Sequence, residues 1–214
     1  MQAAVDPSAC TFIINAMRIG LISDIHGDLK ALDRALMLLE NRADMIWCAG
    51  DLVGRGRHPN EVVEKIVGAG IPTVLGNHDE IALTRGYYYS TDEDMFRECQ
   101  PRTLRLLLTL PRTYRARIGG RTVVMVHGTP RSNAESMNLM PAYRERALHW
   151  LNKIGADILI TGHTHVPIST YGSRGLIVNP GSLFDPAGSP RSSSETYGVL
   201  DTSALTFSYY PLWD

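Results

Sequence analysis

The stretch Ile-Leu-Ile-Thr-Gly-His-Thr-His-Val-Pro, residues 158–167, joins an apolar run to a polar ending. The run is typical of a buried strand, it stops at Gly162, and His163 and His165 follow one residue apart. Residues i and i+2 of an extended chain point to the same side, so both imidazoles should face one region. The stretch therefore predicts a strand with a site for polar chemistry at its carboxyl end.

Four other apolar runs end in the same way. The polar side chains that follow them belong to Asp24 and His26, to Asp51, to Asn77, His78 and Asp79, and to His127. One histidine after a strand is more often a hydrogen-bonded structural residue than a ligand, and one aspartate is often only a cap. Five of the seven histidines nevertheless lie in these places, and the exceptions are His58 and His149. Because α/β sheets form ligand sites at the carboxyl ends of strands, the joint pattern predicts one shared site.

The residue types in this pattern favour a metal centre. Imidazole and carboxylate together suit Mn, Fe, Co, Ni and Zn, whereas the absence of cysteine from the pattern disfavours a structural zinc site. A two-metal site needs a carboxylate that bridges ions about 3.5–4 Å apart, and Asp51, which follows Gly50, is the expected bridge. His163 and His165 can then each hold one of the two cations.

The first third of the chain alternates strand-like and helical patterns. Strands are expected over residues 18–23, 44–49 and 71–75, and helices over residues 28–41 and 59–67, the first of them capped by Asp28. This βαβαβ order implies a parallel sheet with helices packed on it.

The rest of the chain changes character. Residues 80–110 are expected to be helical and loop-rich, with Tyr87–Tyr89 buried against the core or forming a lid or a partner surface. A hairpin around Gly119-Gly120 and a helix over residues 141–154 are accompanied by short strands, over residues 113–118, 121–126, 157–161, 168–171, 176–178, 197–201 and 205–210. We expect one α/β domain of two packed sheets flanked by helices.

Composition narrows the classes of function. The chain has 214 residues, and its 21 basic residues nearly balance its 22 acidic ones, so there is no strong nucleic-acid signal and no attraction to an anionic membrane. Cys10, Cys48 and Cys99 are an odd, scattered set, which favours a reducing, cytoplasmic location, with Cys48 expected to be buried. No apolar stretch approaches the roughly 20 residues of a membrane span. Residues 1–16 are expected to be a dispensable N-terminal extension, and residues 17–214 a single domain.

The ordered blocks resemble those of the calcineurin-like metallophosphoesterases. The family pattern D-x-H, G-D, G-N-H-[DE], H and G-H-x-H is complete, as Asp24-Ile25-His26, Gly50-Asp51, Gly76-Asn77-His78-Asp79, His127 and Gly162-His163-Thr164-His165. The small bacterial and archaeal phosphodiesterase branch is the most similar, because it shares Ser-Asp-Ile-His-Gly, Pro-Asn-Glu-Val-Val and the late Asn-Pro-Gly-Ser of residues 179–182. The resemblance covers residues 18 to about 201 and implies a four-layer α/β/β/α sandwich of two mixed sheets flanked by helices.

The resemblance also implies roles for individual residues. The first divalent ion would be held by Asp24, His26, Asp51 and His165. The second would be held by Asp51, Asn77, His127 and His163. His78 would face the scissile phosphate and stabilise or protonate the leaving oxygen, and Asp79 would orient His78. The alternative for Asp79 is a plain helix cap.

The expected reaction is hydrolysis of a small phosphoester by two divalent ions, Mn first among the ions considered and Fe, Ni, Co or Zn after it. The cations neutralise the phosphate and lower the pKa of a shared water, and the bridging hydroxide attacks phosphorus in line. A phosphodiester substrate is expected before a phosphomonoester.

Some residues of the chain have features that bear on the substrate. Arg55 matches the phosphate-gripping arginine of the related protein Ser/Thr phosphatases, but Gly54 stands where they have Asp, and the phosphodiesterase branch commonly has an aromatic residue at position 55. Arg55 is therefore either a phosphate ligand or a solvated loop residue. Gly181 and Ser182 either contact phosphate or form a plain turn. Seven arginines lie in the acid-free segment from Cys99 to Ala134, and most are expected on a solvated face, with Arg131 the best candidate for substrate binding.

Other functions remain open at this point. Arg55 favours a protein phosphatase, and a non-catalytic scaffold on the same fold is a third hypothesis, although every ligand and His78 are retained. A nucleic-acid exonuclease is disfavoured by the missing positive charge. A homo-oligomer is suggested by the family resemblance alone.

Overall fold

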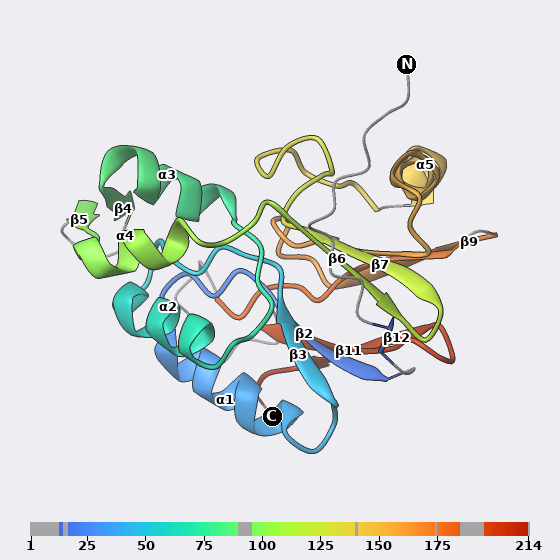
Figure 1. Ribbon diagram of the computed structural model, residues 1–214, viewed down its shortest axis with the longest axis horizontal. Coiled ribbons are helices and arrows are strands. Elements are labelled where there is room, and N and C mark those ends of the chain that lie inside the picture. Colours follow the sequence, from blue (N-terminus) through green and yellow to red (C-terminus); the bar gives the residue numbers. More distant parts are fainter. Residues whose placement is uncertain are drawn as a thin grey trace.

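The computed structural model describes residues 13–14, 17–89, 96–139, 141–173, 175–184 and 195–213 (Figure 1). Two large sheets dominate it, with strand orders β1-β6-β7-β8-β10-β9 and β12-β11-β2-β3. The strands of the first are β1 (Ile13–Ile14), β6 (Thr113–Ile118), β7 (Arg121–Val126), β8 (Ile158–Ile160), β9 (Ile168–Gly172) and β10 (Gly175–Asn179). Those of the second are β2 (Arg18–Ile22), β3 (Met45–Cys48), β11 (Thr196–Asp201) and β12 (Thr206–Pro211).

Both sheets are mixed. In the first, β7, β8 and β10 run parallel to one another, while β6 and β9 are antiparallel to their neighbours β7 and β10. In the second, β2 and β3 are parallel, while β11 is antiparallel to β2 and to β12. A separate antiparallel pair is formed by β4 (Tyr87–Tyr89) and β5 (Phe96–Glu98).

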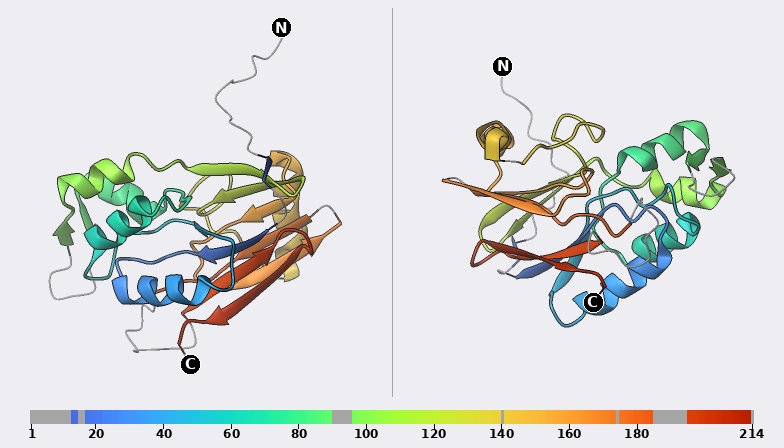
Figure 2. Two further views of the ribbon diagram at one scale, coloured as in Figure 1. Left: turned by 60° about the horizontal axis from the view of Figure 1, so that its bottom comes forward. Right: turned by 180° about the vertical axis from the view of Figure 1, so that it is seen from behind.

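The helices lie on the outer faces of the two sheets and beside them (Figure 1). They are α1 (Leu29–Leu39), α2 (Pro59–Gly68), α3 (Asn77–Arg85), α4 (Pro101–Leu107) and α5 (Arg144–Ile154), with a 3-10 turn at Pro141–Tyr143 before α5. Figure 2 shows the two sheets facing each other, with α5 outside the six-stranded sheet and α1 outside the four-stranded one. The predicted four-layer α/β/β/α sandwich is confirmed.

Alternation along the strands explains the layers. In β7, Val123 and Met125 enter the apolar cluster between the sheets, whereas Val124 and Val126 pack with α5. The same alternation occurs in β8, where Leu159 packs under α5 and its neighbours face the other sheet. Successive side chains of a strand point to opposite faces, so a strand covered on both sides must be apolar throughout.

The predicted strand over residues 71–75 is wrong. The structure has only an isolated bridge between Thr73 and Cys48 at this place. Pro72 has no N–H to donate, and the amide of Leu75 turns away to donate to the carbonyl of Pro111 at 2.8 Å. The ladder beside β3 is therefore too short to count as a strand.

Most of the other boundaries agree with the expected ones to within a few residues. Asp28 caps α1, since its side chain accepts a hydrogen bond from the amide of Ala31 at 2.9 Å. Cys48 is fully buried, and burial raises the pKa of its thiol. The side chains of Tyr87–Tyr89 lie outside the described residues, so the expectation for them stays a prediction. Among the described helices, none has the length and apolarity needed to cross a bilayer.

Candidate metal centre

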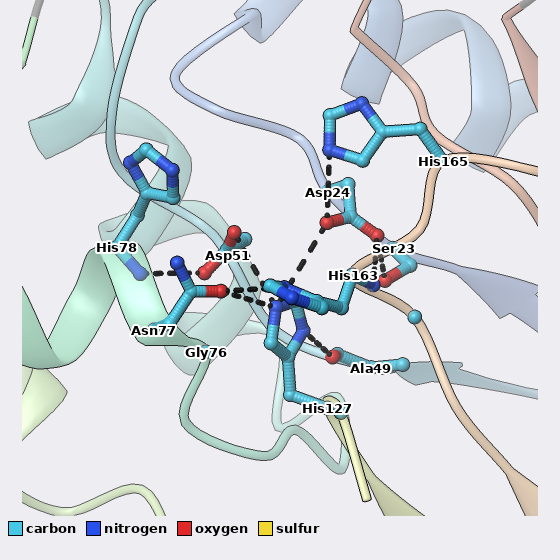
Figure 3. Close-up of polar contacts among 12 residues, drawn as sticks. Ser23, Asp24, Ala49, Asp51, Gly76, Asn77, His78, His127, His163 and His165 are labelled. Carbon is cyan, nitrogen blue, oxygen red and sulfur yellow. Dashed lines mark hydrogen bonds and ion pairs between the residues drawn. The ribbon is translucent and has the colours of Figure 1, made fainter. Parts of the chain in front are cut away.

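The loops after the strands bring the predicted polar residues together, and Figure 3 shows the labelled side chains in one place. Asp24 and His26 follow β2, Asp51 follows β3, and His127 follows β7. His163 and His165 follow β8, and Asn77 and His78 form the first turn of α3. All the candidate ligands named from the sequence therefore meet in one place, although residues 24 and 165 lie far apart in the chain.

One group of donor atoms surrounds His26. Nε2 of His26 lies 3.1 Å from Nε2 of His165, 3.9 Å from Oδ1 of Asp24 and 3.7 Å from Oδ2 of Asp51. Nε2 of His165 is 3.3 Å from Oδ1 of Asp24. Two imidazole nitrogens and two carboxylate oxygens thus point at a common space.

A second group shares Asp51 with the first. Nε2 of His127 lies 3.4 Å from Oδ2 of Asp51 and 3.0 Å from Oδ1 of Asn77. The same amide oxygen of Asn77 is 2.8 Å from Nδ1 of His163. Oδ2 of Asp51 therefore stands between the two groups.

These spacings fit ligands of a cation. Nitrogen and oxygen ligands sit about 2.0–2.2 Å from an ion such as zinc, which places two ligands of one ion about 3.0–3.4 Å apart. The separations of 2.8–3.9 Å between the facing atoms cover that range. The donor set, which contains no sulfur, is the one that borderline divalent ions prefer.

A buried carboxylate oxygen without a hydrogen-bond donor also indicates a cation site. Oδ1 of Asp24 is buried and forms no hydrogen bond within the described residues, although Nε2 of His165 lies nearby. Oδ2 of Asp24, in contrast, accepts from the hydroxyl of Ser23 at 2.6 Å and from the amide of His163 at 3.0 Å. A buried acceptor left without a donor costs about 1–3 kcal/mol, and a cation at this point would remove that cost.

Backbone carbonyls fix the tautomers of two histidines. Nδ1 of His127 lies 2.7 Å from the carbonyl oxygen of Ala49, and Nδ1 of His26 lies 3.3 Å from that of Val53. A carbonyl only accepts, so Nδ1 carries a hydrogen, and in the neutral ring the lone pair is on Nε2. Such a contact is how proteins orient a metal-binding imidazole, and here both lone pairs face the donor groups.

The electrostatic environment of the site favours a positive charge. Burial by itself lowers the pKa of His127, but the carboxylates of Asp51 and Asp24 outweigh it and raise the pKa to about 10. Burial raises the pKa of Asp51, yet His127 holds it well below its usual value. For His26, burial prevails and lowers the pKa to about 4. A proton or a metal cation is therefore favoured between His127 and Asp51.

The backbone is left-handed at most of the candidate ligands. The φ angles are 53° at Asp24, 50° at His26, 55° at Asp51, 68° at His163 and 58° at His165. Each such residue other than glycine costs on the order of 1–3 kcal/mol and persists only where its surroundings hold it. The chain accepts this strain at the positions that turn the five side chains inward.

Two glycines make room for the carboxylates. A Cβ atom on Gly76 would lie 2.1 Å from Oδ1 of Asp51, and one on Gly162 would lie 2.1 Å from Oγ of Ser23 and 2.9 Å from Oδ2 of Asp24. Since real Cβ atoms do not approach other atoms so closely, a side chain at either position would displace a candidate ligand.

His78 lies next to the first group of donors, and one of its ring nitrogens comes within 4.8 Å of ligand atoms of His26 and Asp51. Its amide donates to Oδ1 of Asp51 at 2.8 Å, and its ring centre is 4.8 Å from that of His26. Burial lowers its pKa, and the positive charge of Arg55 lowers it further. At neutral pH the imidazole is neutral and borders the space in front of the candidate ligands.

Asp79 has the contacts of a cap. Its Oδ1 accepts from the amides of Leu52 and Val53 at 2.9 and 3.0 Å, and its Oδ2 accepts from the amide of Gly76 at 2.9 Å. Both oxygens are thus engaged by backbone, which matches the cap alternative rather than direct orientation of the His78 ring.

Arg55 is half-buried in the loop after Asp51, with a φ of 61°. Burial is the main cause of the lowered pKa of His78, and the positive charge of Arg55 lowers that pKa as well. The neighbouring Gly54 has no space for a side chain, because its Cβ would lie 2.8 Å from Nδ1 of His78. An aspartate at position 54 is therefore incompatible with the observed place of His78.

The turn at residues 179–182 forms its hydrogen bonds within the protein interior. The amide of Gly181 donates to Oδ1 of Asn179 at 2.8 Å, and Oγ of Ser182 lies 2.9 Å from the carbonyl oxygen of Asp24. Both residues are buried. These contacts describe the plain turn of the two alternatives, since they direct the amide and the hydroxyl away from a substrate.

The arginines of the acid-free segment mostly bind other parts of the protein. Arg131 forms hydrogen bonds with the carboxylate of Glu135 and is exposed. Arg115 donates to the carbonyl oxygens of Ile154 and Gly155 at the end of α5. The guanidinium of Arg131 is thus paired with Glu135, four residues later, and its expected role in substrate binding stays a prediction.

The side chains of Ser23 and Asn179 support the site, and the sequence analysis did not predict this. Ser23 donates to Oδ2 of Asp24, as described above. Nδ2 of Asn179 donates to the carbonyl of Gly162 at 2.7 Å and to Oγ1 of Thr164 at 3.1 Å, which ties the loop between the two histidines to the late turn. Both residues lie in short motifs, Ser-Asp and Asn-Pro-Gly-Ser, that could have marked them, but only the fold shows what their side chains contact.

The comparisons with known proteins agree on one family. A family model described as the calcineurin-like phosphoesterase superfamily domain matches residues 17–205. A protein of Methanocaldococcus jannaschii is 30% identical over 174 residues, which cover 78% of this chain and 70% of that protein. Phosphodiesterase YfcE of Escherichia coli is 26% identical over 196 residues, or 89% of this chain and 90% of YfcE. The crystal structure of a metallophosphoesterase from Sphaerobacter thermophilus, 31% identical, covers 92% of this chain and 88% of its own with a TM-score of 0.69.

Proposed function

Because this chain belongs to the calcineurin-like phosphoesterase superfamily, we propose that it is a hydrolase of small phosphodiesters that works with two divalent metal ions. The observation that carries the proposal is the position of Asp51, whose Oδ2 faces both groups of donor atoms. A carboxylate in that position is what a two-metal site needs for a bridge. The family resemblance to YfcE, named a phosphodiesterase, supports the diester over other esters.

We assign the ligands from the two groups of donors. Asp24, His26, Asp51 and His165 would hold one ion, and Asp51, Asn77, His127 and His163 the other. Manganese is proposed first, because nitrogen and oxygen ligands without sulfur suit it, and Fe, Co, Ni and Zn satisfy the same chemistry. When bound, the ions neutralise the phosphate and lower the pKa of a water molecule that acts as nucleophile.

Three residues that are not assigned as metal ligands have the remaining roles in the reaction. A ring nitrogen of His78 lies within 4.8 Å of donor atoms of His26 and Asp51, but the family resemblance does not place it among the ligands, so we assign it to the leaving oxygen, which it stabilises or protonates. Arg55 places a guanidinium near His78, where it can bind two phosphate oxygens. Asp79 acts through the backbone, because it holds both the loop after Asp51 and the start of α3.

The competing functions differ in the residues around His78. A protein phosphatase of the related group has Asp where this chain has Gly54, and the close approach of Gly54 to His78 leaves no room for that side chain. A non-catalytic scaffold needs neither His78 nor a complete ligand set. The phosphodiesterase is therefore the better account of the site, with a phosphomonoesterase as the second candidate. We also propose a cytoplasmic location and leave a homo-oligomer as a hypothesis that the family suggests.

The test is hydrolysis and metal content measured on the same sample. The protein is loaded with Mn²⁺ and assayed with bis-p-nitrophenyl phosphate, p-nitrophenyl phosphate and a phosphoserine peptide. We expect about two ions per chain and the highest kcat/KM for the diester, and Asp51→Asn should lose both ions together. Loss of a single ion would contradict the bridging role, and a preference for the phosphopeptide would replace the proposed function.

A further inference from the structure

Residues 182–184 form a short segment that lies against the loop after β2. The hydroxyl of Ser182 lies 2.9 Å from the carbonyl oxygen of Asp24, and the amide of Leu183 donates to the carbonyl of Ser23 at 3.1 Å. The side chain of Leu183 is fully buried in an apolar cluster. Two hydrogen bonds and a buried side chain therefore fix this segment to the loop that carries two candidate ligands of the first ion.

Phe184 ends the segment and places its ring on a candidate ligand. The centres of the Phe184 and His26 rings are 5.6 Å apart, and the ring planes meet at 71°. Such an edge-to-face arrangement is one that aromatic pairs prefer. The amide of Phe184 donates to Oγ of Ser182 at 3.0 Å, and the carbonyl oxygen of Phe184 lies 2.9 Å from the same hydroxyl. The ring thus packs on His26 from a backbone that is itself anchored.

His26 has the longer of the two carbonyl contacts that orient candidate ligands. Its Nδ1 lies 3.3 Å from the carbonyl oxygen of Val53, whereas Nδ1 of His127 lies 2.7 Å from that of Ala49. Hydrogen bonds from N–H to oxygen are commonly about 2.7–3.2 Å long. Because the contact of His26 is at the end of that range, it orients the imidazole less firmly, and a second contact has more effect on His26 than on His127.

Two other rings surround His26, and both have further roles. The ring centres of His78 and His165 lie 4.8 and 5.1 Å from that of His26. Nε2 of His165 faces Nε2 of His26 as a second candidate ligand, and the proposed function assigns His78 to the leaving oxygen. The side chain of Phe184 has neither a ligand atom nor an ionisable group, so its contact with His26 can only hold the imidazole in place.

We infer that Phe184 is a positioning residue for the first ion, an inference that rests on the proposed function. Its ring holds the imidazole of His26 so that Nε2 faces the ion, and residues 182–184 supply the anchored backbone from which the ring acts. Partners that orient a metal-binding imidazole typically change metal affinity about 10–100-fold when they are removed. Within the described part of the chain, the printed ring contact of Phe184 is with His26 and not with the histidines assigned to the second ion, His127 and His163.

The experiment measures the affinity of each ion by calorimetry. Mn²⁺ is titrated into the full chain after treatment with a chelator. Phe184→Ala should weaken one of the two binding steps about tenfold and leave the other unchanged. Phe184→Tyr, which keeps the ring, should retain the wild-type affinity. An alanine variant with wild-type affinity for both ions would overturn the inference.

Phe207→Ala is the matched control for loss of a half-buried phenyl ring. Phe207 is exposed to the same degree class as Phe184 but lies on β12, in contact with the cluster between the sheets. Its removal should leave both metal affinities unchanged, even where it lowers the Tm. An equal loss of affinity in Phe207→Ala would trace the effect of Phe184→Ala to general loosening of the fold and overturn the inference.

A second background assigns the weakened step to His26. His26→Ala removes a ligand of the first ion and should leave one binding step. In that background Phe184→Ala should change the remaining affinity by less than about twofold, because the contact through which Phe184 acts is gone. A further tenfold loss there would mean that Phe184 does not act through His26.

The metal-free protein gives a result that does not depend on the proposed function. Long-range proton–nitrogen NMR spectra of histidine side chains report which ring nitrogen carries the hydrogen. We expect His26 to carry it on Nδ1 in the wild-type protein and to populate both tautomers in Phe184→Ala, while the spectrum of His127 is unchanged. That result supports the positioning role even if the wild-type protein binds fewer than two ions, in which case the proposed function fails alone. Identical His26 spectra in the two proteins would overturn the inference.

Discussion

The residues at the metal centre are held in conformations that only the complete fold can stabilise. Asp24, His26, Asp51, His163 and His165 all have positive φ, and each sits in a loop pinned by backbone hydrogen bonds to another loop. The amide of Asp24 donates to the carbonyl of Gly50, and that of His26 donates to the carbonyl of Asp51. Strain at the ligands is thus offset by the joining of the loops, which keeps the donors in place before any ion binds.

His78→Ala tests the division between ligands and catalyst. Since we assign His78 to the leaving oxygen and not to either ion, the variant should keep both metal ions and lose about 10²–10⁴-fold in kcat, the usual contribution of a proton-transferring histidine. Steady-state kinetics and metal analysis on one sample measure both effects.

His149→Ala is the control for that experiment, because His149 is exposed on α5 and should not matter. Full activity of His78→Ala would remove His78 from the mechanism. Loss of a metal ion would make it a ligand.

Sequence patterns predicted which candidate donors come together, whereas the contacts of the candidate substrate-binding residues needed the structure. Metal-binding side chains follow strands in recognisable blocks, so Asp24 and His163 could be named without a structure. The pairing of Arg131 with Glu135 could not be predicted, because Glu135 is a solvent-facing residue that belongs to no recognisable motif. Likewise, whether the amide of Gly181 faces a substrate or Asn179 depends on how the turn closes.

At the scale of elements, the main difference from the prediction lies in the segment before α3. The block Gly76-Asn77-His78-Asp79 was expected to follow a strand, with a helix cap as one alternative for Asp79; the strand is missing, and the block opens a helix. Asp79 at its third position accepts from the amide of Gly76 and closes the first turn. The apolar run before the block resembled a strand because its side chains are buried, although Pro72 limits its pairing.

Asp79→Asn tests the cap. An amide in place of the carboxylate turns an NH₂ group toward at least one of the three backbone N–H groups that Asp79 now accepts from. We expect a loss of about 1–3 kcal/mol in the free energy of unfolding, measured by urea denaturation, because buried donors lose their acceptor.

Asp28→Asn is the matched control, since Asn caps a helix about as well as Asp and the stability of α1 should barely change. An Asp79→Asn protein of normal stability with a large loss of kcat would favour direct orientation of His78.

The N-terminal segment is the other feature at this scale. Ile13–Ile14 pairs with the edge strand β6, whereas Met17 is tied to Thr202 by hydrogen bonds in both directions. The family model also begins at residue 17. A chain that starts at Met17 should therefore fold, keep kcat and melt within a few degrees of the full chain, because two residue pairs at an edge contribute little.

Circular dichroism melting and the diester assay measure these properties. Failure of the shortened chain to fold would show that residues 1–16 belong to the domain.

At the scale of the molecule, the two sheets supply the frame on which distant loops meet. The four-stranded sheet delivers Asp24 and Asp51, and the six-stranded sheet delivers His127 and His165. The cluster between the sheets, built around Trp47, Met125 and Ile160, fixes the distance between them. The alternation of apolar residues predicted this packing, while the convergence of the loops followed only from the rule that ligand sites form at strand ends.

This arrangement links metal binding to global stability. The unfolded chain separates residues 24 and 165 and has no site, so ions bind the folded state alone. A ligand at a hundredfold excess over its Kd then stabilises the fold by about 2.7 kcal/mol. For a domain of this size 1 kcal/mol raises the Tm by about 2–4 °C, so each ion at that excess should raise the Tm by about 5–10 °C.

Melting curves at increasing Mn²⁺ concentration, followed by circular dichroism after prior treatment with a chelator, provide the measurement. The rise should be nearly absent in Asp51→Asn, because that variant loses the bridge between the two groups of donors, and magnesium at the same ionic strength should have a smaller effect, since it prefers oxygen ligands. A wild-type Tm independent of manganese, or an equal rise in Asp51→Asn, would mean that the two sheets do not bring their loops together to hold metal.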